Sequence, residues 1–276
     1  MFRTNFSQNF LKSSSLVEKL IRQTSIGPED TVYDIGAGQG IISENLVKVV
    51  KQVVAIEPDA KYSQILKDKF QDVSNINIIP ADFLKLDLPS KPFKVFSNIP
   101  FNITAEILSK LCFTQSGFTE GYFVMEYKAT TKPMFSVLLN NVAKSRIVFD
   151  FEKTDYTPSP SVDTVLFHIE MKKPIMENIE LFNDFIAFAF LQWQPTMEKV
   201  LQKIFTKPQV FRLIKDLKIE KSGTQKDITF STWRALFNFY EKNQQIIPTK
   251  VKGSHKEQLQ LQAKLKQTHN TKVSYN

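Results

Sequence analysis

A short segment near the middle of the chain combines an amide, a proline and an aromatic ring. Asn98, Pro100 and Phe101 follow directly on the apolar run 93–96. The amino group of adenine is a poor nucleophile, because its lone pair is delocalised into the ring, until hydrogen-bond acceptors draw its N–H groups out of the ring plane. The Asn98 side-chain oxygen and a backbone carbonyl aimed by the fixed φ of Pro100 can be those acceptors, and Phe101 offers a ring for a base to stack on. The segment predicts methylation of an adenine amine, although a strand followed by an ordinary proline turn also fits it.

A glycine-rich turn follows the first predicted strand, 31–35. Gly36 and Gly38 carry no Cβ and let the backbone approach a nucleotide closely. The dinucleotide-binding pattern requires a third glycine at position 41, where the chain has Ile, and there is no Lys-Ser/Thr pair for a phosphate loop. Asp34 beside the turn suits a ligand with a positive end, such as the amino group and sulfonium of S-adenosylmethionine. The turn predicts that methyl donor, with a purely structural turn as the alternative.

Two further acidic residues stand where predicted strands end. Glu57 ends the second strand, where an acid can accept the two hydroxyls of an adenosine ribose. Asp82 follows the third strand and can accept the adenine amino group, with Phe83 covering the ring. Each acid alone is more often a solvated loop residue, but an open α/β sheet binds its ligand at the carboxyl ends of successive strands. We expect one pocket at that edge, with Asn98 ending the fourth strand, and a direct methyl transfer that requires no general base.

Short apolar runs alternate with amphipathic segments over the first 170 residues. Such alternation predicts an α/β fold, in which a mostly parallel, Rossmann-like sheet is covered by helices on both faces. Two later runs, joined by a proline-rich turn, predict an antiparallel hairpin at the sheet edge. The predicted strands are 31–35, 53–56, 76–79, 93–96, 122–125, 146–151 and 164–171, and the predicted helices are 41–50, 60–70 and 104–111.

The pattern changes after Lys173, where the remaining apolar residues follow helical spacing. The chain from residue 243 is rich in Gln and Lys, which predicts a basic, flexible tail. The sequence therefore predicts a first domain at 1–173, a small all-α domain at 174–242 and a tail at 243–276. The helices expected in the second domain are 181–193, 196–205, 208–217 and 230–240.

The positive charge of the chain lies in its C-terminal part. The formal net charge is +8. Residues 1–170 hold 18 Lys and Arg against 19 Asp and Glu, residues 171–242 hold 12 against 8, and residues 243–276 hold 6 against 1. A near-neutral first domain suits a small ligand, whereas the basic remainder predicts contact with nucleic acid. A solvated basic surface without a partner is the alternative.

The composition excludes other classes of protein. A chain of 276 residues with 42% hydrophobic and 23% charged residues is typical of a globular protein with a real core. The sequence shows no run of about eighteen apolar residues and no cleavable leader, so we expect a cytoplasmic protein without membrane contact. Cys112 alone excludes an internal disulfide, and three scattered histidines predict no metal site.

These features occur in the order and spacing of a known family. The chain resembles the ribosomal RNA adenine N6-dimethyltransferases, and among them is most similar to the erythromycin-resistance (Erm) methyltransferases of 23S ribosomal RNA. The resemblance covers nearly all of the chain from residue 5 to residue 242. It rests on the segments 6–11, 34–40, 82–83, 98–101 and 203–207, on Glu57, and on the pattern Tyr-x-Pro-x-Pro-x-Val at 156–162.

The resemblance implies roles for these residues. Asn98, Pro100 and Phe101 would form the transfer site, and Tyr156 would stack on the opposite face of the target base. The residues that would bind S-adenosylmethionine are Asn9 and Leu11 at its methionine end, Asp34, Gly36 and Gly38 in the loop, Glu57 and Pro58 at the ribose, Asp82 and Phe83 at the adenine, and Asn98 at the methyl group.

The reaction implied by the resemblance places one or two methyl groups on N6 of an adenine in the peptidyl-transferase region of 23S ribosomal RNA. This blocks macrolide binding and confers macrolide-lincosamide-streptogramin resistance. We expect a monomer that acts on the RNA before ribosome assembly is complete.

Departures from the family pattern keep alternatives open. Position 101 commonly holds Tyr and here holds Phe, which keeps the stacking face and loses a hydroxyl; residues 125–128 also differ, at an RNA-facing surface. One alternative is a small-subunit ribosomal RNA adenine dimethylase acting in ribosome assembly, but Ile99 and the compact C-terminal region favour the Erm type. Another is a non-catalytic nucleic-acid-binding descendant of the fold, against which the intact glycine turn argues. A DNA adenine methylase is disfavoured, because no target-recognition domain of the usual size is present.

Overall fold

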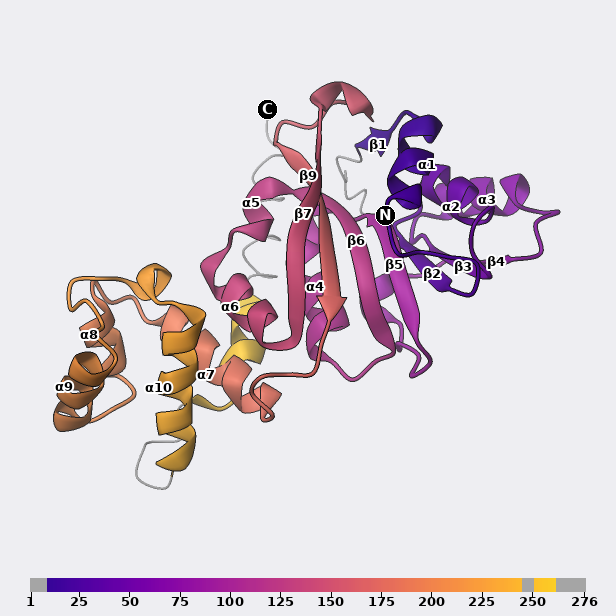
Figure 1. The fold of residues 1–276 in the computed structure, drawn as a ribbon. Coiled ribbons are helices and arrows are strands. Elements are labelled where there is room, and N and C mark those ends of the chain that lie inside the picture. The colour runs from indigo at the N-terminus through magenta and orange to yellow at the C-terminus, as the bar shows by residue number, and fades with distance from the viewer. Residues whose placement is uncertain (1–8, 245–250, 262–276) are drawn as a thin grey trace. The chain divides into compact units, whose positions relative to one another are not determined.

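The computed structural model describes residues 9–244 and 251–261, which form two compact units (Figure 1). The first, here called the sheet unit, holds the chain up to Thr130 and Ala143–Lys172. The second, the helical unit, holds Thr131–Val142 and the chain from Lys173. The predicted continuous first domain, 1–173, is therefore wrong for residues 131–142, because this segment forms a helix that packs with the later helices.

A seven-stranded sheet forms the centre of the sheet unit, in the order β4-β3-β2-β5-β6-β9-β7 (Figure 1). The strands β2 to β6 pair in parallel, whereas β9 is antiparallel to both β6 and β7. The predicted mostly parallel sheet with an antiparallel edge is confirmed. Its strands are β2 (Thr31–Ile35), β3 (Gln52–Ile56), β4 (Ile76–Ile79), β5 (Phe93–Asn98), β6 (Phe118–Glu126), β7 (Ala143–Phe151) and β9 (Thr164–Met171).

Helices connect the parallel strands, and local capping determines where two of them begin. The Ser13 hydroxyl accepts a hydrogen bond from the Leu16 N–H at the start of α1, and the Asp59 carboxylate accepts one from the Lys61 N–H at the start of α3. The predicted helix 41–50 is shorter in the structure and ends at Leu46. The helices of this unit are α1 (Ser14–Arg22), α2 (Ile41–Leu46), α3 (Ala60–Lys69), α4 (Thr104–Phe113) and α5 (Tyr127–Thr130).

A second, very small sheet joins the beginning of the described chain to the loop before β9. The strand β1 (Phe10–Leu11) pairs antiparallel with β8 (Tyr156–Thr157), and Leu11 lies opposite Tyr156. The Lys12 N–H donates to the Asp155 carbonyl at 2.9 Å and extends the pairing. Segments almost 150 residues apart in sequence are therefore held together at one place in the unit.

The helical unit has an aromatic core. The rings of Phe182 and Phe185 pack edge-on against Phe237, and Phe185 also packs edge-on against the buried Trp233. The predicted helix 181–193 ends earlier, so that Trp193 lies outside it. The predicted C-terminal helical region is confirmed, and its helices are α6 (Pro133–Val142), α7 (Ile179–Leu191), α8 (Met197–Leu201), α9 (Lys207–Asp216) and α10 (Phe230–Lys242).

Part of the predicted flexible tail is ordered. Residues 254–261 are helical, and Val251 and Ser254 are buried. The Asp184 carboxylate on α7 accepts hydrogen bonds from the N–H groups of Gly253 at 2.8 Å and His255 at 3.0 Å. The prediction of flexibility is wrong for this segment, because these contacts attach it to α7. The rest of the tail from 245 to 250 and from 262 onward lies outside the described residues.

Candidate active site

The predicted donor-site residues lie near the carboxyl ends of the parallel strands, on both sides of the point where the order of the strands reverses. The chain places β3 and β4 on one side of β2 and β5 on the other. Near this edge the Ser97 hydroxyl, fully buried, accepts from the Ile35 N–H and donates to the Ile35 carbonyl, and so bridges β2 and β5. Open α/β sheets bind ligands in the crevice outside such a switch point. The residues that follow β2 and β5 therefore lie beside the switch point of the sheet.

Asp34 is a buried carboxylate with an unused oxygen. It is only 1% exposed, and its Oδ2 accepts a hydrogen bond from the Ser43 hydroxyl at 2.7 Å. Its Oδ1 has no hydrogen-bond partner among the described residues. Burial raises the pKa of Asp34 to about 7, against the opposing effect of the Ser43 hydrogen bonds. A buried acceptor without a partner fits the cationic amino group of S-adenosylmethionine.

The glycine turn folds back onto β3. Gly36 and Gly38 have φ of 75° and 53°, which side chains with a Cβ rarely adopt. The Glu57 carboxylate accepts hydrogen bonds from the N–H groups of Gly38 at 2.8 Å and Asp59 at 2.9 Å. Burial raises the pKa of Glu57, and these two bonds oppose the rise. Each carboxylate oxygen keeps a second lone pair, so the geometry is compatible with ribose hydroxyls as further donors. Pro58, the next residue, is exposed.

Asp82 begins the short 3₁₀ turn η1 (Phe83–Lys85) after β4. Its Oδ1 accepts a hydrogen bond from the Leu84 N–H at 3.0 Å, which leaves Oδ2 without a partner among the residues described. Phe83 is 3% exposed, and the ammonium of Lys110 lies 5.3 Å from its ring centroid. The ring of Phe83 is therefore buried in this structure, and its predicted place over the adenine stays a prediction.

The Asn98 side chain is oriented by the N-terminal segment. Its Nδ2 donates to the Asn9 carbonyl at 2.8 Å. Since a carbonyl can only accept, the nitrogen must face Asn9, and Oδ1 is the end left as an acceptor; within the described part of the chain it has no donor. Phe101 is half-buried and begins the 3₁₀ turn η2 (Phe101–Ile103). A Cβ placed on Gly36 would lie 3.5 Å from Pro100 Cδ, so the glycine turn and the transfer segment are adjacent.

Tyr156 is brought next to the site. It is 1% exposed, its hydroxyl shares a 2.9 Å hydrogen bond with the Thr164 hydroxyl, and its ring packs edge-on against Phe151. The ring is therefore buried in this structure, and stacking of Tyr156 on the target base stays a prediction. Leu11, paired with it, is buried in the same core cluster. Residues 6–8 of the N-terminal motif lie outside the described residues.

Three residues that contribute to this region were not among the predicted site residues. The ring of Phe10 covers the glycine turn, since a Cβ on Gly38 would lie only 2.6 Å from Phe10 Cε1. Ser43 holds Asp34, and Lys110 contacts the turn after Asp82. Phe10 lies within the N-terminal motif and could have been found there, whereas Ser43 and Lys110 act through folded contacts that no spacing reveals.

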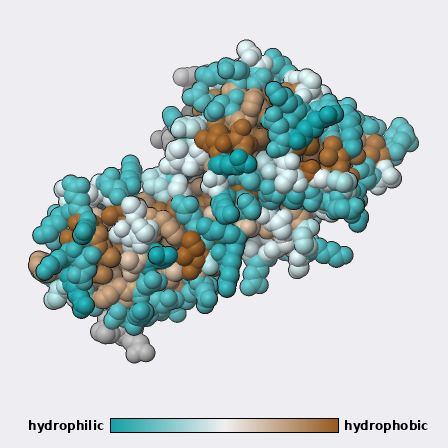
Figure 2. All heavy atoms as spheres, in the orientation of Figure 1, coloured by the Kyte–Doolittle hydropathy of each residue, from teal (hydrophilic) through white to brown (hydrophobic). Residues whose placement is uncertain are grey.

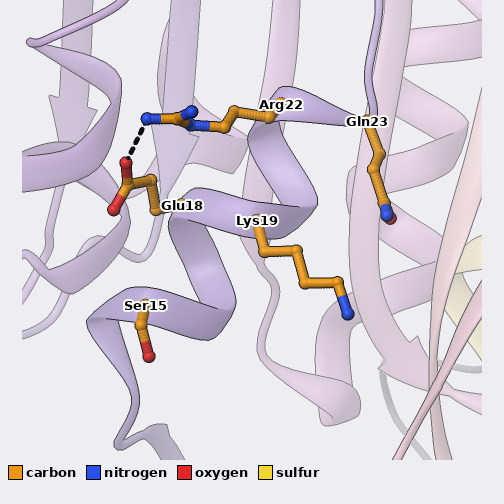
Figure 3. A pocket seen from close by; sticks show the side chains of 5 residues that line it. All are labelled: Ser15, Glu18, Lys19, Arg22 and Gln23. Atoms are coloured by element: carbon orange, nitrogen blue, oxygen red, sulfur yellow. Dashed lines mark hydrogen bonds and ion pairs between the residues drawn. The ribbon is translucent and has the colours of Figure 1, made fainter.

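A surface depression on α1 lies apart from this set. It is lined by Ser15, Glu18, Lys19, Arg22 and Gln23, none of which is a predicted site residue (Figure 3). The Arg22 guanidinium contacts the Glu18 carboxylate at 2.6 Å, and both side chains are largely exposed. Exposed pairs of this kind contribute little energy, and none of the predicted site residues lines the depression, so we do not assign the active site to it.

The described residues contain neither a group of metal ligands nor a membrane-spanning helix. In residues 9–244 and 251–261, no three His, Cys, Asp or Glu side chains are grouped to hold a metal ion. Over the same residues, no helix is long and apolar enough to cross a membrane.

Known proteins resemble the chain over most of its length. A family model described as ribosomal RNA adenine dimethylase matches residues 1–242. An rRNA adenine N-6-methyltransferase of Bacillus licheniformis is 33% identical over 247 residues, which cover 85% of this chain and 86% of that protein.

Two solved structures have the same fold. The 23S rRNA methyltransferase ErmE has a TM-score of 0.71 at 20% identity and covers 83% of this chain and 98% of its own. A dimethyladenosine transferase from Plasmodium falciparum has a TM-score of 0.72 at 16% identity and covers 85% of this chain and 98% of its own.

Proposed function

Because the chain belongs to the ribosomal RNA adenine dimethylase family, we propose that it methylates N6 of one specific adenine of 23S ribosomal RNA. The family makes the protein an adenine N6-methyltransferase of ribosomal RNA, with S-adenosylmethionine as the methyl donor. The proposal adds the large-subunit RNA, transfer of one or two methyl groups, and the macrolide-lincosamide-streptogramin resistance that follows. It also adds that a monomer acts before the ribosome is fully assembled.

The orientation of the Asn98 amide is the observation that supports this chemistry most directly. Its Nδ2 is bound to the Asn9 carbonyl, so Oδ1 is the end that can accept an N–H from the adenine amine. With one N–H held by Oδ1 and the other by a carbonyl beside Pro100, the amine lone pair turns toward the donor methyl group. Alignment and exclusion of water then account for most of the acceleration.

The donor is assigned to residues along the carboxyl edge of the sheet. In this assignment the unpartnered Oδ1 of Asp34 takes the cationic amino group, and the glycine turn cradles the donor. Glu57, with Pro58 beside it, takes the ribose, and Asp82 takes the adenine. Asn9 and Leu11 line the methionine end. When bound, S-adenosylmethionine supplies an electrophilic methyl group whose transfer neutralises the sulfonium.

The helical unit supports an RNA partner through exposed aromatic and basic side chains. Phe211 on α9 is 67% exposed and lies four residues from both Lys207 and Lys215, which are also exposed and share its helix face. An aromatic ring between ammonium groups suits a nucleic-acid strand, whose bases stack on the ring while its phosphates contact the lysines. On the face seen in Figure 2, hydrophobic residues of this unit are exposed among hydrophilic ones.

Trp193, between α7 and α8, adds a second exposed ring. Its side chain is 96% exposed, and it borders a groove of about 500 Å³. The other groove residues are Phe190, Gln192, Gln194, Pro195, Gln225 and Lys226. Amides, a lysine and an open indole are groups that can hydrogen-bond, attract and stack on unpaired nucleotides. This region is where we place selection of the adenine that reaches Asn98.

Support for 23S rather than small-subunit RNA comes from the transfer segment itself. In the small-subunit branch Leu is commoner at the position that Ile99 occupies, and the helical region here is compact. The dimethyladenosine transferase branch remains the second candidate, because the same fold accommodates it.

Primer extension tests the proposal. Ribosomal RNA from a susceptible host, with and without expression of the protein, should show a new stop at one adenine in the peptidyl-transferase region of 23S RNA. The host should also gain macrolide resistance, and expression of Asn98→Ala should produce neither effect. A stop at adjacent adenines in small-subunit RNA would favour the second candidate, and no binding of S-adenosylmethionine by calorimetry would revive a non-catalytic role.

A further inference from the structure

Lys110 on α4 reaches across to the turn that carries Asp82. Its ammonium donates to the carbonyls of Phe83 at 3.0 Å and Leu84 at 2.9 Å, and also to the carbonyl of Leu86. The same ammonium lies over the Phe83 ring, 5.3 Å from its centroid. A lysine ammonium has three N–H donors, so these three carbonyls use all of them. Lys110 therefore fastens η1 from outside, by contacts that the turn cannot make for itself.

The internal hydrogen bonds of the turn do not use all of its carbonyls. Inside it, the Asp82 carboxylate accepts from the Leu84 N–H at 3.0 Å, the Asp82 carbonyl accepts from the Lys85 N–H at 3.0 Å, and the Phe83 carbonyl accepts from the Leu86 N–H at 3.2 Å. The carbonyls of Leu84 and Leu86 are turned toward Lys110 instead. Hydrogen bonds to a charged donor are stronger than neutral ones. Removal of the ammonium would leave three carbonyls without this donor and release the segment that fixes the direction of Asp82.

We propose that Lys110 is a positioning residue for the adenine end of the methyl donor: it holds the 82–86 turn so that the free oxygen of Asp82 faces the adenine amino group. This rests on the assignment of Asp82 to the donor adenine made above. Burial lowers the pKa of Lys110, while the charges of Asp87 and Asp82 oppose that effect, which agrees with a partly desolvated ammonium close to these acids. Lys110 acts through the turn and has no role at the methyl group.

The test compares two product analogues that differ only at the group Asp82 would read. S-adenosylhomocysteine carries the amino group, and S-inosylhomocysteine carries a carbonyl in its place. The full-length wild type, Lys110→Met and Lys85→Met are titrated with each by calorimetry. Lys85 lies in the same turn, and its exposed side chain makes no hydrogen bond or ion pair among the described residues. Lys85→Met therefore removes one positive charge from the turn and leaves the three bonds of Lys110 in place.

We expect Lys110→Met to bind S-adenosylhomocysteine at least roughly tenfold more weakly, the loss expected for one charge-assisted hydrogen bond. Its affinity for S-inosylhomocysteine should change much less, so the preference for adenine collapses. Lys85→Met should keep the wild-type affinities and preference. Thermal unfolding of each variant accompanies the titrations, so that loss of folding is recognised.

Each contrary outcome has its own meaning. An unchanged adenine preference in Lys110→Met overturns the proposal, whether both affinities stay the same or fall together, because a purely structural lysine would move both equally. If Lys110→Met does not fold, Lys110→Gln is measured instead, and the same collapse of preference is required of it, since a neutral amide lacks the charge and has only two N–H donors for three carbonyls. A wild type without adenine preference would refute the assignment of Asp82 itself, and with it the proposal.

Discussion

The side-chain amide of Asn98 can be removed without changing the strand that carries it, because its one hydrogen bond among the described residues is to the Asn9 carbonyl, outside that strand. We expect Asn98→Ala to lower kcat for methyl transfer by at least about a hundredfold, the cost of one preorganised polar group in an active site. The Kd for S-adenosylmethionine should stay within a few-fold of wild type. Transfer of a radiolabelled methyl group to RNA measures the first and calorimetry the second.

Asn102→Ala is the matched control. This amide lies in the turn η2 that follows the strand of Asn98, is exposed, and makes no hydrogen bond within the described chain. It should keep wild-type activity, and full activity of Asn98→Ala beside it would remove the mechanism proposed here.

The ionisation of Asp34 should make stability fall with rising pH. Its pKa is about 7 in the folded protein, whereas a carboxyl in the unfolded chain has its ordinary value of 3.8. Between these pH values the folded state keeps a proton that the unfolded state has lost, so the free energy of unfolding falls by about 1.4 kcal/mol per pH unit at most. Below the window the effect is absent, and above it the loss is complete.

Asp34→Asn stays neutral and should remove this slope. The variant should be more stable than wild type at about pH 8 and nearly equal to it at about pH 4, by chemical denaturation across the range. Equal stability at both pH values would show that the buried carboxyl carries no such penalty.

Donor binding should show the opposite pH dependence. Only the ionised form of Asp34 attracts a cationic amino group, so affinity for S-adenosylhomocysteine should rise with pH up to about 7 and then level off. Calorimetry of wild type and Asp34→Asn over this range tests it, and the variant should bind weakly without the dependence. A wild-type affinity that is flat with pH would place the amino group elsewhere.

At the scale of elements, α9 should contribute salt-dependent RNA binding. The double variant Lys207→Ala/Lys215→Ala removes both ammonium groups beside Phe211. If each contacts a phosphate of an unpaired strand, the slope of log K against log salt should become less steep by about 1.4. Titration with a 23S RNA fragment that contains the target adenine, called the RNA hairpin below, at several salt concentrations measures the slope.

The control for that experiment is Lys51→Ala/Lys91→Ala. Both lysines are exposed and lie just before β3 and β5, at the edge of the sheet opposite the site. Their loss should leave the slope unchanged, and an equal effect of the two pairs would mean that RNA senses only net charge.

Elements with a strong local pattern could be predicted, whereas those made by distant partners could not. The apolar run before Asn98 predicts β5, and Asn98 does end that strand. The strands β1 and β8 have two residues each and show no periodicity, so nothing in the sequence indicates that Leu11 pairs with Tyr156. Residues 131–142 lie between two strands, and only folding assigns their helix to the later domain.

The same distinction applies to the site. Asp34, Glu57 and Asp82 could be placed because each lies close to the carboxyl end of a predicted strand, and parallel strands end at one edge. The burial of a side chain could not be predicted in this way. The stacking role that the resemblance implies for Tyr156 requires an open ring, whereas the ring is buried and its hydroxyl is bonded to Thr164. The reach of Lys110 to Leu84 spans 26 residues and depends on how α4 packs.

At the scale of the whole molecule, we expect the methyl donor and the RNA to stabilise different units. Every residue assigned to the donor belongs to the sheet unit. Ligand binding stabilises the structure it contacts, so S-adenosylhomocysteine should slow amide hydrogen exchange around Gly36 and Gly38 and leave α9 unchanged. The RNA hairpin should slow exchange in α9, and equal slowing of both units by the small ligand would contradict the division of labour.

The pairing of β1 with β8 also determines when, during synthesis of the chain, the segment beside Asn98 can be fixed in place. Translation delivers residues 10–11 early and residues 156–157 only after more than half of the chain has been made. Until then the first strand has no partner, and the segment that carries Asn9 is not held beside the future site. If Asn9 and Leu11 line the methionine end of the donor as proposed, a nascent chain has its glycine turn and its acids long before this end of the site is in place.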